Sequence, residues 1–316
     1  MKNSIWIAFA FLAAAFVSSA CDGVLLGSAH DTVQRTFRVE QGGKLVLDSD
    51  AGSIEVTSGG LDEVRVDVER EVRGATDAEA EQNLKDVRVD FRQDGKDVTV
   101  QARYNHDRFW GFNWGNRLRL RFVILVPAKY NLDLKTDGGS IRVNDLEGSV
   151  FARTLGGSLN FGQIKGPVNG HTSGGSITLE GGTGPLEVDT MGGGIRIGKV
   201  YGPVKARTSG GSITVEEVQG TIQASTSGGS VNATITRQPE GDCELSTSGG
   251  PIHARLRRDL NLNLEAGTMG GRVRTNIPVV LQGEITPSRL EARMNQGGPR
   301  LRLNTLGGSI TIDEIR

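Results

Sequence analysis

Residues 208–217 read "TSGGSITVEE", and almost the same letters, "TSGGSITLEG", stand at residues 172–181. A loop that cradles a phosphate occurs once or twice in a chain, whereas a structural corner recurs at a fixed interval. The number and spacing of the copies therefore decide between these two interpretations.

The unit Thr-x-Gly-Gly-x-(Ile/Leu/Val) occurs nine times in the chain. The first six copies follow one another at intervals of 18 residues, the next two intervals are 21 residues, and the last is 37. Their threonines are Thr136, Thr154, Thr172, Thr190, Thr208, Thr226, Thr247, Thr268 and Thr305. Chance matches would not keep step in this way, so the unit is a structural repeat.

One period, residues 210–227, contains two short strands. Ile213 and Val215 alternate with polar residues, and Ile222 and Ala224 do so again. This alternation between glycine corners predicts an all-β fold, a parallel β-solenoid with turns of about 18 residues. Glycine suits the corners because it accepts positive φ and lets stacked backbones approach closely. Each turn cannot bury its apolar face alone, so the array is stable only as a whole.

The phosphate-loop alternative requires a helix after the glycines, with its N-terminal amides facing the anion. A second strand follows every copy instead, and no copy ends in Gly-Lys-Ser/Thr. We therefore interpret the glycine pairs as structural corners.

The region before the repeats has a different pattern. One degenerate copy, "SDAGSIEV", lies at 49–56, and longer alternating segments follow at 64–72, 87–93, 98–104 and 117–126. A short helix is predicted over 76–86, because Thr76 and Glu79 are placed as a capping box. These features predict an antiparallel β cap with one short helix that covers the first edge of the solenoid.

The predicted boundaries are residues 33–130 for the cap and 131–316 for the solenoid. Residues 1–20 look like an export signal, with Lys2 before a short apolar run, and 21–32 are expected to be a linker. The stretch "SSAC", residues 18–21, resembles the end of a bacterial lipoprotein signal, which would make Cys21 the acylated anchor. Ser18 stands where that pattern usually has leucine, and ordinary cleavage after Ala20 is the alternative. Either route predicts an exported protein of the cell envelope, periplasmic or at the cell surface.

The repeats also carry a family resemblance. "DSDAGSIEV" (48–56), "FVILVPAKYNLDLKTDGGSIRV" (122–143) and the reiterated "TSGGSI" resemble the bacterial DUF4097 family of adhesin-like β-strand repeat proteins. The resemblance covers roughly residues 35–316 and implies a repeat architecture. It implies little about chemistry.

Composition and motif spacing give no sign of catalysis. The 36 basic and 37 acidic side chains nearly balance, which argues against a nucleic-acid partner. The four histidines, His30, His106, His171 and His253, show no metal-ligand spacing, and the segment at 48–52 lacks the ligand pattern of a calcium loop. Cys243 has no partner if Cys21 is acylated. We expect no catalytic residue, no metal and no cofactor.

A carbohydrate-active β-helix enzyme is the main rival. Such an enzyme needs clustered carboxylates on one face of the solenoid. The central turns offer Glu180, Glu187, Asp189, Glu216 and Glu217. Exposed polar strand positions explain these residues more simply.

The stretch "YNHDRFWGFNWGNR" (104–117) holds five of the sixteen aromatic residues and lies between two predicted strands. A long hairpin loop of this composition is a candidate for stacking on sugars or for contact with another protein. The candidate ligand-binding residues are Tyr104, Arg108, Phe109, Trp110, Phe112 and Trp114. The alternative is that these rings fold onto the open end of the solenoid as a lid.

The last turns are rich in arginine. Residues 251–302 contain nine arginines and four acidic residues, so an arginine-rich face for anionic polymers or lipid headgroups is one interpretation, and a solvated face is the other. The sequence as a whole predicts a non-enzymatic envelope module, adhesin-like and anchored in the membrane through Cys21. Its partners would be envelope glycans or envelope proteins. A self-associating scaffold is the third possibility.

Overall fold

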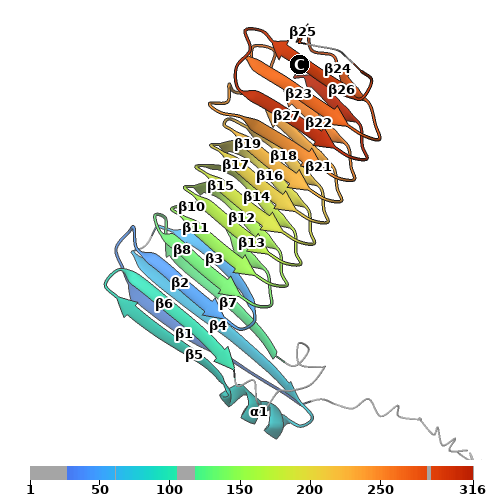
Figure 1. Ribbon diagram of the computed structural model, residues 1–316. Coiled ribbons are helices and arrows are strands. Elements are labelled where there is room, and N and C mark those ends of the chain that lie inside the picture. The colour runs from blue at the N-terminus through green and yellow to red at the C-terminus, as the bar shows by residue number, and fades with distance from the viewer. Residues whose placement is uncertain (1–26, 61, 105–117, 283–285, 316) are drawn as a thin grey trace, which may run out of the picture.

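The computed structural model describes residues 27–60, 62–104, 118–282 and 286–315. Two 14-stranded sheets lie face to face and form a long flattened rod with one continuous hydrophobic core between them (Figure 1). The single helix of the described residues, α1 (Asp77–Lys85), lies at the N-terminal end of the rod. Among the described residues, no helix has the length and apolar character needed to cross a bilayer.

Sheet A contains, in spatial order, β1 (Gly27–Arg38), β4 (Glu63–Gly74), β7 (Leu118–Pro127), β3 (Ser53–Gly59), β9 (Ile141–Val143), β12 (Leu159–Lys165), β14 (Ile177–Thr183), β16 (Ile195–Tyr201), β18 (Ile213–Val218), β20 (Val231–Ile235), β22 (Ile252–Leu256), β28 (Ile310–Glu314) and β24 (Val273–Thr275), and β10 (Leu146–Glu147) pairs with β12.

Sheet B contains, again in spatial order, β25 (Val280–Leu281), β26 (Arg289–Met294), β23 (Leu262–Thr268), β27 (Arg300–Thr305), β21 (Cys243–Thr247), β19 (Ile222–Thr226), β17 (Val204–Thr208), β15 (Leu186–Thr190), β13 (Val168–Thr172), β11 (Val150–Thr154), β8 (Asn131–Thr136), β2 (Lys44–Ser49), β6 (Asp97–Tyr104) and β5 (Val87–Asp94).

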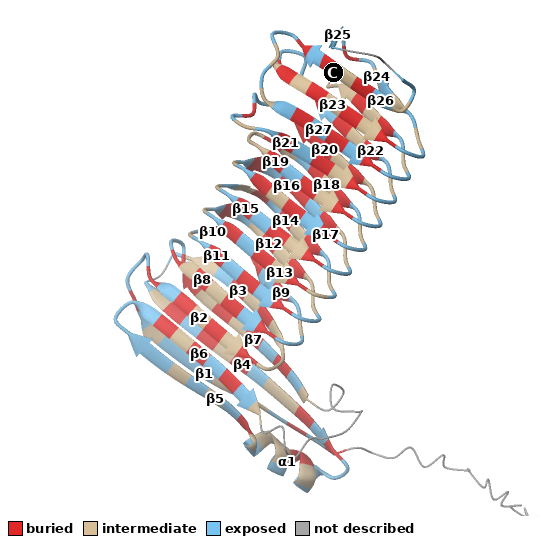
Figure 2. Ribbon diagram, in the orientation of Figure 1, coloured by how far each residue is buried: buried red, intermediate tan, exposed pale blue. Residues whose placement is uncertain are grey.

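One turn of the solenoid runs from a strand of sheet B through a Thr-x-Gly-Gly corner to a strand of sheet A. Parallel pairing places Ile213 between Ile195 and Val231, its equivalents in the neighbouring turns. Ile213 is fully buried, whereas Thr214 lies on the outer face. The same alternation of inward buried and outward exposed or half-buried residues follows most repeat strands (Figure 2). The predicted parallel β-solenoid is therefore confirmed.

The corner threonines face the core, and each joins two turns. Thr208 is 6% exposed. Its Oγ1 donates to the carbonyl oxygen of Gly193 at 2.7 Å and accepts from the amide of Gly211 at 3.3 Å. All nine corner threonines donate to a glycine carbonyl of the adjacent turn, over 2.6–2.9 Å. A polar group inside the core must find a partner, and this ladder supplies one at every turn.

The second glycine of each corner is required by close approach. A Cβ on Gly211 would lie 2.3 Å from the carbonyl oxygen of Gly193, and one on Gly175 would lie 2.1 Å from that of Gly157. Positive φ, the other reason expected for these glycines, is found at Gly139 but not at Gly211. The stacked backbone of the neighbouring turn therefore excludes a side chain there, whatever the dihedral angles allow.

The turns do not stack in the order of the sequence at either end. The last turn, β27–β28, lies between the turns β21–β22 and β23–β24. The interval of 37 residues before Thr305 contains β25 and β26, which the chain forms after β24 and before it returns to β27. The first turn, β2–β3, likewise lies between β6–β7 and β8–β9.

The N-terminal cap extends the two sheets by antiparallel pairing of β1 with β4, β4 with β7 and β5 with β6. Strand β1 already begins at Gly27, inside the range expected to be a linker. The predicted capping box is present, since Thr76 Oγ1 accepts from the amide of Glu79 at 3.2 Å. The Glu79 carboxylate accepts from the amide of Ala75 at 2.8 Å, one residue before the N-cap.

Each end of the rod is closed differently. At the N-terminal end, Phe37 of β1 and Phe91 of β5 meet across the gap between the sheets, with ring centroids 6.2 Å apart. At the C-terminal end, Ile277 is buried and Val279 packs against the core. The buried Cys243 occupies an inward position between Ile222 and Leu301, and burial raises the pKa of its thiol.

Candidate functional site

On the outer face of sheet B, the residue before each corner threonine differs in size and charge from one end of the rod to the other. Parallel pairing aligns these residues in a single row. In spatial order they are Lys135, Arg153, His171, Asp189, Arg207, Ser225, Ser246, Asn304 and Gly267. Long or charged side chains thus give way to short, uncharged ones at Ser225, and the surface becomes hollow beyond that point.

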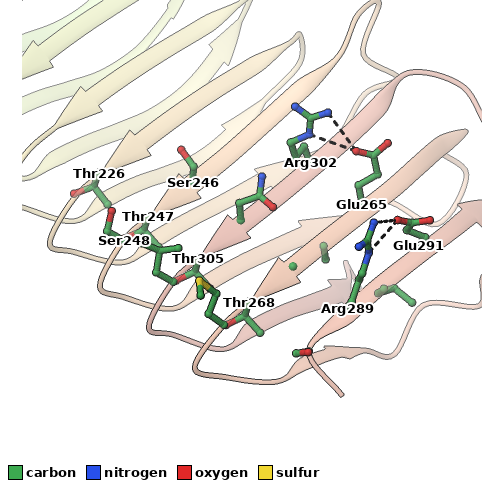
Figure 3. A pocket seen from close by; sticks show the side chains of 17 residues that line it. Thr226, Ser246, Thr247, Ser248, Glu265, Thr268, Arg289, Glu291, Arg302 and Thr305 are labelled. Atoms are coloured by element: carbon green, nitrogen blue, oxygen red, sulfur yellow. Dashed lines mark hydrogen bonds and ion pairs between the residues drawn. The ribbon is translucent and has the colours of Figure 1, made fainter. Parts of the chain in front are cut away.

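A groove of 560 Å³ follows, which we call the C-terminal groove (Figure 3). It is formed by the outer faces of β21, β27, β23 and β26 and by the corners beside them. Ser246, Asn304 and Gly267, which are neighbours in this row, form its floor. A Cβ on Gly267 would have no neighbour closer than Asn304 Oδ1, at 3.6 Å, so the space above this glycine is open.

Two ion pairs form one wall of the groove. Arg302 donates from Nε and Nη2 to Glu265 Oε2, at 3.4 Å each, and Arg289 donates from Nε to Glu291 Oε1 at 3.0 Å. Two arginines thereby face two glutamates, so the wall carries no net charge. It still presents guanidinium donors and carboxylate acceptors side by side (Figure 3).

Exposed apolar side chains form the opposite wall. Met269 is 83% exposed and Leu306 is 56% exposed, and both follow corner threonines of adjacent turns. The amide of Gly270 donates to the carbonyl oxygen of Leu306 at 2.9 Å, which fixes the two corners next to each other. Neighbouring exposed apolar residues of this size mark a contact surface more often than an isolated one does.

The five acidic residues of the central turns lie on two different faces of the rod, and four of them are paired individually. On sheet B, Glu187 pairs with Lys205 and Asp189 with His171. On sheet A, Glu216 pairs with Arg196 at 3.0 Å and Glu217 with Lys199 at 3.0 Å. Glu180 lies on sheet A, two turns from Glu216, with Gly198 in the turn between them. These five acids therefore do not form one cluster.

The pKa values of two of these carboxyls move away from what a general acid needs. The hydrogen bond from Lys205 lowers the pKa of Glu187, and a hydrogen bond from Gln219, with a smaller effect of Lys199, lowers that of Glu217. A carboxyl that protonates a leaving group needs a raised pKa instead. Within the described ranges, no three His, Cys, Asp or Glu residues are grouped so as to hold a metal ion.

The predicted aromatic loop lies almost entirely outside the described residues, as do Arg108, Phe109, Trp110, Phe112 and Trp114. Tyr104 is the last residue of β6, and burial, followed by the charges of Asp50 and Asp137, raises its pKa. The role assigned to this loop remains a prediction. Cys21 also precedes the described part of the chain.

The arginines of residues 251–302, for which an arginine-rich face was one interpretation and a solvated face the other, are divided between the two sides of the rod. Arg255 and Arg274 lie on sheet A, and Arg293 lies on sheet B. Several others are neutralised locally by acids. These pairs are Arg257 with Asp259, Arg289 with Glu291, Arg300 with Asp242, and Arg302 with Glu265.

The C-terminal groove was missed at the level of sequence. The 18-residue period predicts the inward positions, because their residues repeat. It does not predict the outward positions, because their residues vary from turn to turn. A signal was nevertheless present, since the residue before the threonine changes from Lys, Arg, His, Asp and Arg to Ser, Ser, Gly and Asn. The position of Asn304 between Ser246 and Gly267 depends on the inserted last turn and has no signal in the sequence.

The architecture is that of a repeat β-solenoid closed by a β cap. The family model described as Toastrack DUF4097 matches residues 43–313, and the chain belongs to this family. No curated protein matches the sequence.

Several solved structures are similar. A candidate cell adhesion protein from Clostridium sporogenes is 12% identical, with 90% of this chain and 100% of that chain covered and a TM-score of 0.23. A candidate adhesin from Bacteroides fragilis is 12% identical, with 90% and 97% covered and a TM-score of 0.36. A candidate lipid-binding protein from Parabacteroides distasonis is 11% identical, with 90% and 97% covered and a TM-score of 0.35. Similarity at this level supports no statement about a ligand or a partner.

Proposed function

We propose that this protein is an exported, non-enzymatic binding module of the cell envelope, anchored by a lipid on Cys21. Its function is to hold the C-terminal groove away from the membrane. The observation that carries the proposal is the placement of the two ends. The described chain starts at Gly27 beside α1, and the strands that form the groove, β21, β27, β23 and β26, lie towards the opposite end of the rod (Figure 1).

The distances suit a rod anchored at one end. Thirteen strands follow one another from β1 to β24, and at about 4.8 Å per strand they span roughly 58 Å. Only residues 22–26 separate Cys21 from β1, and such a segment reaches at most about 20 Å. A lipid at Cys21 would therefore keep the α1 end near the bilayer and leave the groove free to face outward.

The construction of the rod supports a binding role. The threonine ladder and the close glycine corners link each turn to the next, so the outer surface is presented on a regular scaffold. The paired carboxylates of the central turns give no arrangement suited to acid–base hydrolysis. The groove, by contrast, combines a recess with polar and apolar walls, as binding sites do.

The anchor is tested by substitution of Cys21. We expect Cys21→Ser to release the mature protein from the membrane fraction and to abolish incorporation of labelled palmitate, because one residue supplies the whole apolar anchor. Cys243→Ala is the matched control, since it removes the other cysteine and should leave both readouts unchanged. Equal membrane retention of Cys21→Ser and the wild type would refute the lipid anchor.

A further inference from the structure

We infer that the C-terminal groove binds an uncharged glycan chain, laid across β21, β27, β23 and β26. This inference rests on the proposed binding function and adds the site and the class of ligand. It depends on three features of the groove: its floor, its charge balance and its apolar wall.

The floor offers free side-chain groups and no free backbone. Within the described residues, the Ser246 hydroxyl and the Asn304 side-chain amide have no hydrogen-bond partner. Strand β27 pairs with β21 and β23, and β23 pairs with β27 and β26, so the backbone of the floor is already used in the sheet. An extended peptide that binds by strand addition needs an open edge. The floor therefore favours a ligand recognised through hydroxyl groups.

The charged wall selects against highly charged polymers. A polyanion laid along it would meet Glu265 and Glu291, and a polycation would meet Arg289 and Arg302. Sugar hydroxyls both donate and accept hydrogen bonds, so they match adjacent guanidinium and carboxylate groups. Because both ion pairs are at least partly exposed to solvent, this wall remains accessible to a ligand.

The apolar wall and the length complete the match. Met269 and Leu306 can cover the C–H faces of sugar rings while the hydroxyls turn toward Ser246 and Asn304. The four strands that form the groove span three spacings, about 14 Å, which is long enough for an oligosaccharide rather than a single sugar. The volume of 560 Å³ lies within the range of about 300–1,000 Å³ typical of small-ligand sites.

The test uses the mature chain from residue 21 and a panel of uncharged linear hexasaccharides, namely β-1,4-glucan, α-1,4-glucan, β-1,4-mannan and chitin fragments. Polygalacturonate, polylysine and an uncharged unstructured peptide are the comparison probes. Binding is measured by titration calorimetry at physiological salt. We expect at least one hexasaccharide to bind and the comparison probes not to bind. Binding of a comparison probe in its place, or of nothing, would overturn the assignment.

Matched variants locate the binding site. Met269→Asp and Ser246→Arg should each weaken binding of the hexasaccharide by about tenfold or more, which corresponds to about 1.4 kcal/mol. Met191→Asp and His171→Arg place the same residues at the same repeat positions outside the groove and should leave affinity unchanged. Melting curves of all four variants should match the wild type, which separates loss of the site from loss of folding. Equal losses in both pairs would place the ligand elsewhere.

The glycan assignment and the anchor fail separately. If Cys21→Ser releases the protein but no hexasaccharide binds, only the ligand class is wrong. If a hexasaccharide binds at the groove but Cys21→Ser remains in the membrane, only the anchor is wrong.

Discussion

Two stretches of sheet B share one interior and differ in their exterior. From β8 to β17 the inward row is Leu134, Ala152, Gly170, Val188 and Ala206, and from β19 to β23 it is Ala224, Leu245, Leu303 and Ala266. All of these are small or aliphatic. Outside, at the position before each corner threonine, the first stretch presents long or charged residues and the second presents short uncharged ones.

This difference shows which positions of a solenoid can vary in residue type without disturbing the stack. An inward residue contacts its equivalents in the turns on both sides, so its size and polarity are constrained by the stack. An outward residue contacts solvent and can change from turn to turn. Binding surfaces of such proteins are therefore best sought where the repeat is irregular, and here the irregular stretch is the C-terminal groove.

The largest loss of stability that would test this comparison is expected from substitutions of the corner glycines. Gly211→Val would force a side chain onto the carbonyl oxygen of Gly193, 2.3 Å from its Cβ, with a loss of about 3 kcal/mol in unfolding free energy. Gly175→Val and Gly229→Val should cost similar amounts, because equivalent turns share the same close approach.

The matched control is Gly267→Val, on the outer face, where the nearest atom to a Cβ is 3.6 Å away. Its melting temperature should stay near that of the wild type. The explanation by backbone approach would be wrong if Gly267→Val and Gly211→Val lowered the melting temperature equally. Loss of ligand binding by one corner variant with unchanged stability would instead revive the functional-loop interpretation.

The alternation around Ile213 and the 18-residue spacing were sufficient to predict the solenoid, its inward residues and its glycine corners. The role of the threonines was not predictable in the same way. Thr154 and Gly139, for example, become partners only when two turns stack. The order in which the turns stack at the two ends could not be predicted either, because repeats of nearly identical sequence do not show which turns are neighbours in space. Outward residues such as Ser246 follow no period, and the groove they form was accordingly missed.

A smaller effect is expected from the threonine ladder. Thr208→Val keeps the shape of the side chain but leaves the amide of Gly211 and the carbonyl of Gly193 without this hydroxyl, at a cost of about 1–3 kcal/mol. Urea denaturation should show the shift in midpoint. Thr214→Val, on the outer face, is the control and should shift the midpoint little. A ladder that only fills space would give the same midpoint for both variants.

The smallest effect should come from exchanging outer residues between the two stretches. Arg153→Ser and Ser246→Arg swap the residue types at one repeat position, and each should change the unfolding free energy by no more than about 0.5 kcal/mol. Arg153 forms no ion pair with another described residue, and Ser246 lies on a hollow surface, so neither change breaks a contact. Thermal unfolding of the two variants and of the double variant checks this expectation. A loss comparable to that of Thr208→Val would mean that the outer row is part of the scaffold, and the distinction between a constrained interior and a free exterior would fail.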